Sequence, residues 1–186
     1  MTSVAIQGIA GSFHEQAARS YFGNDASISS SSNFSELVEK VANSHTDYGM
    51  IAIENTVAGT IHHNLQLIRA SRVNIIGEIK LRIQQNLVAL PGVTLKELRE
   101  VRSHYMALNQ SKRFLNLHPQ LERIADNDTA SAIKRIADEN LKSSAAIGSE
   151  YAANMYGLSV LEEGIETNKE NYTRFLAISG SDFSQP

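Results

Sequence analysis

The sequence contains no cysteine, so it can form neither a disulfide nor a thiolate metal ligand. No apolar run approaches the roughly 20 residues that a membrane-spanning helix needs. Its 17 Lys and Arg and 20 Asp and Glu give a net charge of -3 without a dense basic run, which argues against nucleic acid as a partner. No Pro- or Gly-rich linker divides the chain, so any two lobes must be joined by strands.

The composition and the first residues favour a folded cytoplasmic protein. With 186 residues, 42% of them hydrophobic, the chain can bury a sizeable core in one domain or two small lobes. Residues 2–8 have the pattern of a strand that enters a glycine turn, without the basic start and apolar stretch of a secretory signal. We therefore expect a soluble protein in the cytoplasm, with no membrane partner.

Strand-like runs alternate with amphipathic helical windows, which predicts an α/β fold with a mostly parallel sheet flanked by helices. In the first part of the chain we expect strands at 4–6, 27–32 and 48–53, and helices at 13–22, 34–41 and from Gly59 to about Ile68. Ser12 with Glu15, and Asn33 with Glu36, have the spacing of helix N-caps, and the first pair has that of a capping box.

The second part of the chain begins with a long β-rich stretch, 73–90, which Pro91-Gly92 ends and whose length suits a strand that leaves one lobe and enters another. After Pro91-Gly92 we expect strands near 100–102, 121–125, 145–147, 158–161 and 175–178, and helices at 105–114, 129–137 and up to Met155. No repeat of solenoid length is present.

Glycines lie between the first strand and the first helix, in the segment 8–13. Backbone N–H groups and the helix dipole can bind an anion in such a turn, although the spacing is not that of a dinucleotide fingerprint and no Walker-type Lys follows. A tight turn with Ser12 as the N-cap explains the same residues, and the two interpretations are compatible.

Polar side chains also mark the ends of two strands. Glu54, Asn55 and Thr56 follow an apolar strand, where open α/β sheets place ligand groups, although a polar turn is the alternative. Thr173 and Arg174 open the last strand, where Thr173 can donate a hydrogen bond and Arg174 can bind a carboxylate through two N–H groups. An ordinary strand with a solvated arginine is again the alternative.

We expect no metal. His62 and His63 are adjacent, so on a helix they point about 100° apart, and the six His form no HxxxH or HExxH motif. Glu162, Glu163 and Glu166 are interpreted as a solvated face or turn.

Taken together, five segments resemble the catalytic domain of the prephenate dehydratase family. They are 8–13 with Ala17-Ala18, 53–56 with Gly59, Ser103-His104 with Gln110, 128–130, and 171–175. They recur in the family's order along nearly the whole chain. Two positions depart from the family pattern, Tyr105 in place of a proline and Ser111 where a cysteine is common.

The resemblance implies a two-lobed fold like that of type II periplasmic binding proteins, with a cleft between the lobes. By analogy, the first lobe comprises 1–77 and 167–180, and the second 78–166. The cleft would gather four residues from the first lobe and two from the second: Ser12, Glu54, Asn55 and Thr56, and Gln110 and Thr129.

The resemblance also implies a carbon–oxygen lyase that converts prephenate to phenylpyruvate in phenylalanine biosynthesis, without a cofactor. Thr173 would assist the departing hydroxyl, with Glu54 as a possible proton relay. Asn55 and Gln110 complete the expected catalytic set. The expected substrate-binding residues are Ser12, Thr56, Thr129, Arg174 and Phe175.

The sequence leaves alternatives for the substrate, for regulation by phenylalanine and for the oligomeric state. Arogenate is an alternative substrate, and a non-catalytic sensor of small anions on the same scaffold is the alternative from another class. Family members commonly continue into an ACT domain that binds phenylalanine, for which residues 181–186 leave no room, so we expect no inhibition of this polypeptide by phenylalanine. A homo-oligomer is compatible with the sequence.

Overall fold

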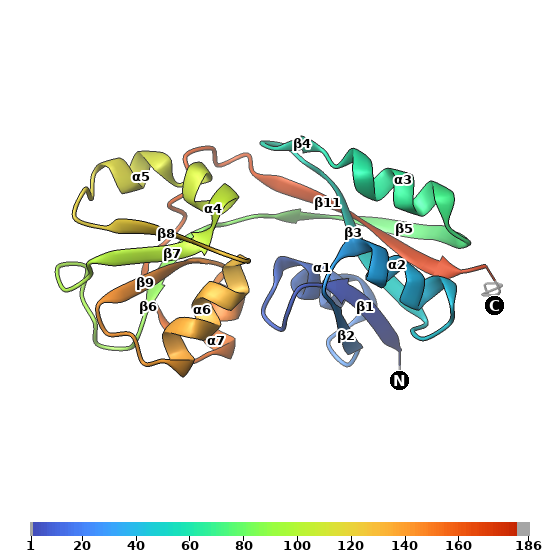
Figure 1. The fold of residues 1–186 in the computed structure, drawn as a ribbon, viewed down its shortest axis with the longest axis horizontal. Coiled ribbons are helices and arrows are strands. Elements are labelled where there is room, and N and C mark those ends of the chain that lie inside the picture. The colour runs from blue at the N-terminus through green and yellow to red at the C-terminus, as the bar shows by residue number, and fades with distance from the viewer. Residues whose placement is uncertain (1, 182–186) are drawn as a thin grey trace. The chain divides into compact units, whose positions relative to one another are not determined.

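The computed structural model describes residues 2–181, which form two compact α/β units (Figure 1). The described residues of Met1–Arg82 and Glu170–Pro186 form the first unit, and Ile83–Lys169 form the second. Each unit contains one sheet, so the predicted α/β class is confirmed. Of the expected tail 181–186, all but residue 181 lies outside the described part of the chain.

The first unit contains a mixed sheet rather than the mostly parallel one that we expected. Its strands are β1 (Ser3–Gln7), β2 (Ser27–Ser31), β3 (Tyr48–Asn55), β4 (Gly59–Thr60), β5 (Val73–Arg82) and β11 (Tyr172–Gly180). Their order is β2-β1-β3-β11-β5, with β4 beside β3. β1 is parallel to β2 and β3, whereas β11 is antiparallel to β3 and β5. The antiparallel pair arises because β5 leaves this unit and β11 returns to it alongside.

Helices cover both faces of this sheet. They are α1 (Phe13–Phe22), α2 (Phe34–Ala42) and α3 (His62–Ala70). Because alternate strand residues point to opposite faces, the strands contribute to two separate hydrophobic clusters. Val4, Met50 and Phe175 pack with α1, while Ile51 and Leu176 pack with residues of α2 and α3.

The two predicted N-caps are confirmed. The Ser12 hydroxyl accepts a hydrogen bond from the Glu15 backbone N–H at 3.3 Å, and the Asn33 side chain accepts one from Glu36 at 2.9 Å. The reciprocal bond of a capping box is displaced by one residue, however. The Glu15 carboxylate accepts from the N–H of Gly11 rather than from that of Ser12.

The second unit has a mixed sheet of order β10-β6-β9-β7-β8. Its strands are β6 (Asn86–Ala89), β7 (Glu100–His104), β8 (Glu122–Asp126), β9 (Ser144–Gly148) and β10 (Ser159–Glu162), and its helices are α4 (Tyr105–Gln110), α5 (Lys112–Asn116), α6 (Thr129–Asp138) and α7 (Glu150–Met155). The single helix expected over 105–114 is divided at Ser111, a fully buried residue that ends α4 and precedes α5.

Within residues 2–181, no helix has both the length and the apolar character that crossing a bilayer requires.

The packing of α2 on the first sheet predicts a strong effect of Gly49→Ala. A Cβ at this position would lie 2.8 Å from Val41 Cγ2, 3.0 Å from Ile178 Cγ1 and 3.1 Å from Leu37 Cδ2. Overpacking of this kind costs about 1–3 kcal/mol, and we expect a loss of that size in the free energy of unfolding measured with urea. Ser30→Ala, on the exposed part of β2, is the control and should change it by less than about 0.5 kcal/mol.

Candidate functional site

Three segments of the first unit lie toward the same end of its sheet. β1 and β3 are parallel, so the turn after β1 and the last residues of β3 lie at their carboxyl ends. β11 runs the other way and begins beside the end of β3 (Figure 1). Thr173 of β11 pairs there with Asn55 of β3. In α/β sheets, ligand groups gather at the carboxyl ends of parallel strands.

The side chain of Asn55 joins the end of β3 to the start of β11. Its Nδ2 donates to Asn171 Oδ1 at 2.9 Å, to the Tyr172 carbonyl at 3.2 Å and to Thr173 Oγ1 at 3.0 Å. Asn55 is 9% exposed and Asn171 is fully buried. Buried amide groups of this kind need partners, so the three contacts also stabilise the sheet edge.

The other end of the same amide is also engaged. Asn55 Oδ1 accepts from the backbone N–H groups of Val57 at 3.0 Å and Ala58 at 2.9 Å. A nitrogen at that position would face two N–H donors, so the orientation of the amide follows from the network. Because both ends of the amide are used internally, Asn55 positions its neighbours rather than presenting a free group to a ligand.

The hydroxyls of Thr173 and Ser12 have the same pattern of hydrogen bonding. Each residue is 8% exposed, and each hydroxyl oxygen accepts a hydrogen bond from within the unit, Thr173 from Asn55 and Ser12 from the Glu15 N–H. A hydroxyl has one hydrogen to donate, and neither hydroxyl donates to another described residue. Both hydroxyls can therefore donate to a ligand.

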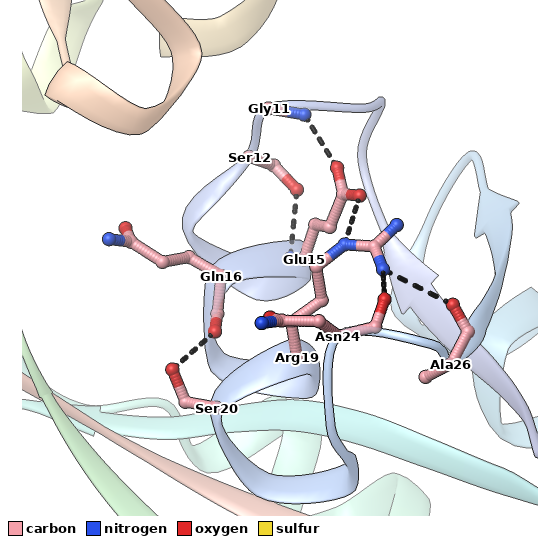
Figure 2. Close-up of polar contacts among 8 residues, drawn as sticks. All are labelled: Gly11, Ser12, Glu15, Gln16, Arg19, Ser20, Asn24 and Ala26. Carbon is pink, nitrogen blue, oxygen red and sulfur yellow. Dashed lines mark hydrogen bonds and ion pairs between the residues drawn. The ribbon is translucent and has the colours of Figure 1, made fainter. Parts of the chain in front are cut away.

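The glycine turn after β1 already contains an anion, because its helix supplies one. The Gly11 N–H donates to Glu15 Oε2 at 2.7 Å, and the carboxylate is also bonded to Arg19 (Figure 2). At the other end of the turn, the Gly8 N–H donates to the Ser31 carbonyl at 3.0 Å. These two N–H groups are thus occupied in this structure, and a substrate carboxylate could not use them without displacing their partners.

Arg174 lies on the opposite face of the sheet from Thr173, as successive strand residues do. Its Nε donates to Glu78 Oε2 at 2.9 Å, and its Nη1 lies 3.9 Å from Glu54 Oε2. The side chains of Arg174, Glu54 and Glu78 are 46%, 48% and 55% exposed. Two carboxylates therefore balance the charge of the guanidinium, and each of these ion pairs is accessible to solvent.

Thr56 and Phe175, two of the expected substrate-binding residues, make contacts within the first unit that hold its structure. Thr56 Oγ1 donates to the Glu170 carbonyl at 2.6 Å and accepts from the Tyr172 N–H at 2.9 Å, which ties β3 to the approach to β11. Phe175 is 1% exposed and packs in the core, where its ring contacts that of His14.

His14 is a partly buried titratable residue, and no sequence motif includes it. Its ring lies 5.0 Å from the Phe175 ring and 5.5 Å from the Phe34 ring, measured between centroids. Nε2 is excluded from solvent and has no hydrogen-bond partner among residues 2–181. Burial lowers the pKa of His14 to about 4. The sequence around His14 does not indicate this packing, because both aromatic neighbours come from other elements, α2 and β11.

In the second unit, Gln110 ends α4 and is bonded to two other segments. Its Oε1 accepts from Gln85 Nε2 at 3.4 Å, and its carbonyl accepts from the Thr167 N–H at 2.7 Å. Gln85 also donates its backbone N–H to Glu166 Oε2 at 2.9 Å. The interpretation of Glu166 as part of a solvated face or turn is wrong, because the residue is 1% exposed and binds this backbone group.

Thr129 is the first residue of α6, whose N-cap Asp128 accepts from the Ser131 N–H at 2.7 Å. His104 caps α4 through Nδ1, which accepts from the Met106 N–H at 3.3 Å. Partial burial lowers the pKa of His104, and the charge of Asp128 opposes this effect. Across the described part of the chain, no group of three or more His, Asp or Glu side chains is arranged to hold a metal ion.

Comparison with known proteins shows the family. The family model described as prephenate dehydratase matches residues 4–182, and the chain belongs to that family. A curated relative, arogenate dehydratase/prephenate dehydratase 2 of Arabidopsis thaliana, is 38% identical over 176 residues. The matched segment covers 95% of this chain and 46% of the relative, so the chain spans about half of the length of that protein.

Two solved structures resemble the whole fold. One is prephenate dehydratase from Arthrobacter aurescens in complex with L-Phe, with a TM-score of 0.89 and 28% identity, covering 100% of this chain and 62% of that one. The other, described as GqqA, a quorum quenching acylase, has a TM-score of 0.86 and 27% identity, covering 99% of this chain and 66% of that one. Because these two descriptions name different activities, the fold by itself does not specify the reaction.

The desolvated ring of His14, whose Nε2 is excluded from solvent, predicts a loss of stability in mild acid. The folded protein holds His14 neutral down to a pKa of about 4, whereas the unfolded chain binds a proton near the ordinary value of 6.5. Its contribution to stability is complete above pH 6.5 and falls as the pH drops from 6.5 to 4, by as much as about 3 kcal/mol.

Urea unfolding of the wild type and of His14→Phe at pH 7.5 and 4.5 measures this contribution. Phe retains an aromatic ring against Phe34 and Phe175 and cannot be protonated. We expect the variant to lose less stability between the two pH values than the wild type does. Equal losses in the two proteins would show that His14 stays unprotonated or does not affect unfolding.

Proposed function

We propose that this chain catalyses the decarboxylative dehydration of prephenate to phenylpyruvate. The hydrogen bond from Asn55 to Thr173 carries the proposal, because it orients a neutral hydroxyl donor at the edge of the sheet. Membership of the prephenate dehydratase family supports the substrate class, and the matched region includes both residues.

The proposed reaction needs a donor near the departing hydroxyl and little else. The bond between the ring and its carboxylate carbon breaks, and CO2 leaves. The electron pair moves through the ring, which becomes aromatic, and expels the hydroxyl at the opposite ring carbon. That hydroxyl takes up one proton and leaves as water. The reaction requires no oxidant or reductant, so its main demands on the protein are orientation and hydrogen bonding.

Thr173 is proposed as the donor to the departing hydroxyl. A threonine hydroxyl is a poor acid, so its contribution depends on its position and direction. The Asn55 N–H occupies a lone pair of the Thr173 oxygen, and the hydroxyl hydrogen must therefore point away from Asn55. A donor held in this way in advance does not have to reorient when negative charge develops on the leaving oxygen.

Glu54 is proposed to relay the proton that the departing hydroxyl takes up when it leaves as water. The side chain is 48% exposed, and its Oε2 lies 3.9 Å from Arg174 Nη1. A relay role requires that the bound substrate exclude water from this carboxyl and favour its protonated form.

The remaining residues are proposed to bind and orient the substrate. Ser12 can donate its hydroxyl hydrogen to a carboxylate. Arg174 is directed to the other face of the sheet from Thr173, but it lies at the beginning of β11, so the proposal requires that its guanidinium leave Glu78 and Glu54 and reach the pyruvyl carboxylate around the end of the strand. The ring carboxylate should be held weakly, since tight binding would oppose its loss as neutral CO2. Substrate-orienting roles are also proposed for Gln110 and Thr129. Thr56 and Phe175 would act only indirectly, by holding the start of β11 through their internal contacts.

Arogenate is the second candidate substrate, because the Arabidopsis relative is named as a dehydratase of both compounds. It differs from prephenate by an amine in place of the keto group. Ultraviolet assays of the purified protein with each compound, which detect phenylpyruvate or phenylalanine, distinguish the two. Absence of turnover with both would overturn the proposed function.

Removal of the Thr173 hydroxyl is the most direct test of its role. We expect Thr173→Ala to lower kcat by about 10²–10⁴-fold, the usual contribution of a positioned proton donor, and Thr173→Ser to retain most of the activity. Asn55→Ala should also lower kcat, since the Thr173 hydroxyl would lose its fixed direction. A folded Thr173→Ala protein with near-normal turnover would eliminate Thr173 as the donor.

Arg174 is tested by a change in KM. If the guanidinium binds the substrate carboxylate, Arg174→Gln should raise KM by about tenfold or more, because charge-assisted hydrogen bonds are among the stronger ones. Glu78→Gln should lower KM or leave it unchanged, since it removes a competing partner of Arg174. A normal KM for Arg174→Gln would mean that the residue only pairs with carboxylates of its own sheet.

A further inference from the structure

An ion pair within α1, between buried Glu15 in the first turn and partly exposed Arg19 in the last turn, is not used by the proposed chemistry. The Glu15 side chain is 3% exposed, and its two oxygens have different partners. Oε2 accepts from the Gly11 N–H at 2.7 Å, and Oε1 accepts from Arg19 Nε at 2.8 Å (Figure 2). The Glu15 backbone N–H in turn donates to the Ser12 hydroxyl. Glu15 thus contacts both residues that form the end of the glycine turn.

Arg19 extends this contact to the neighbouring connection. Its Nη1 donates to the carbonyl of Asn24 and, at 3.3 Å, to that of Ala26, just before β2 (Figure 2). The last residue of β2, Ser31, accepts from the Gly8 N–H at the beginning of the turn. The turn is therefore held at both ends.

Backbone geometry explains why such support is needed. Gly8 and Gly11 have φ values of 99° and 88°, a region that only glycine adopts readily. Glycine is also the residue with the most conformational freedom to lose on folding. Because Ser12 directly follows Gly11, the position of its hydroxyl depends on bonds made by the turn rather than on the backbone preferences of the turn residues.

We propose that Glu15 and Arg19 are positioning residues that hold the Ser12 hydroxyl where the substrate carboxylate binds. This role rests on the proposed function, in which Ser12 contacts the substrate. The carboxylate of Glu15 occupies the Gly11 N–H near the helix N-terminus, where the helix dipole favours negative charge, and this leaves the Ser12 hydroxyl as the donor to the substrate carboxylate. Arg19 balances that charge, so the carboxylate need not repel an anionic substrate strongly.

The second helix offers a matched control within the same unit. Asn33 caps α2, the Glu36 carboxylate accepts from the Ser32 N–H at 2.7 Å, and Lys40 pairs with Glu36 at 3.0 Å. Cap, acid and base have the same spacing as in α1. The Glu36 side chain is 37% exposed, however, and the resemblance to the family assigns no substrate contact to Asn33.

The test compares four variants by steady-state kinetics with prephenate. They are Glu15→Ala, Glu15→Gln, Glu36→Ala and the double variant Ser12→Ala/Glu15→Ala, with Ser12→Ala as the single reference. We expect Glu15→Ala to raise KM by about tenfold, the effect of one lost hydrogen bond, while kcat changes by less than about threefold. Glu15→Gln keeps an acceptor for the Gly11 N–H and should fall between the wild type and Glu15→Ala.

A merely structural effect would give a different pattern. Glu36→Ala should lower thermal stability and leave KM at the wild-type value. Because Glu15 acts through Ser12, the double variant should be no worse in KM than Ser12→Ala alone. Hydrogen exchange of the Gly11 amide, measured without substrate, should be faster in Glu15→Ala than in Glu15→Gln.

Specific results overturn the proposal. A folded Glu15→Ala protein with the KM of the wild type would remove the positioning role while leaving the proposed function intact. A full additive loss in the double variant would show that Glu15 does not act through Ser12. An inactive wild type, with prephenate and with arogenate, would overturn the proposed function and this role together.

Discussion

The amide side chain of Asn55 is the contact on which the candidate site depends. All of its hydrogen-bonding groups have partners within the first unit. The amide nitrogen donates to residues at the start of β11, and the amide oxygen accepts from two backbone N–H groups. One side chain therefore sets the end of β3, the turn after it and the direction of the Thr173 hydroxyl. Removing the amide would leave several buried polar groups without partners. The resulting loss in the free energy of unfolding would exceed that from removing an ordinary surface contact.

Neutral hydrogen-bond donors suit the proposed reaction better than strong charges do. Thr173 and Ser12 both offer a hydroxyl hydrogen, while the cationic side chains near them already have carboxylate partners: Arg19 pairs with Glu15, and Arg174 with Glu78. A carboxylate that must leave as CO2 gains nothing from a strong cation, because such binding would stabilise the reactant. The arrangement leaves Arg174, in an exposed and exchangeable ion pair, as the proposed contact for the carboxylate that stays.

Much of the fold and part of the candidate site follow from local patterns. The helix that begins after Ser12 was predicted from periodicity and capping, and the strand β3 was predicted over 48–53, two residues short of its end at Asn55. These signals are contained within a few neighbouring residues. Predictions failed where the structure depends on contacts between segments that are distant in the sequence. The sheet is mixed because β11 returns from the second unit beside β5, and Glu166 is buried because it binds the backbone of Gln85.

The sequence by itself determined the elements, their caps and the polar residues at the strand ends, because each depends on neighbours within about one helical turn or on alternation along a strand. Only the tertiary structure decided the partners of those residues. Asn55 meets Asn171 and His14 meets Phe175 through contacts between segments far apart in the chain. Such pairings follow from strand order and register, which no periodicity within a single segment specifies.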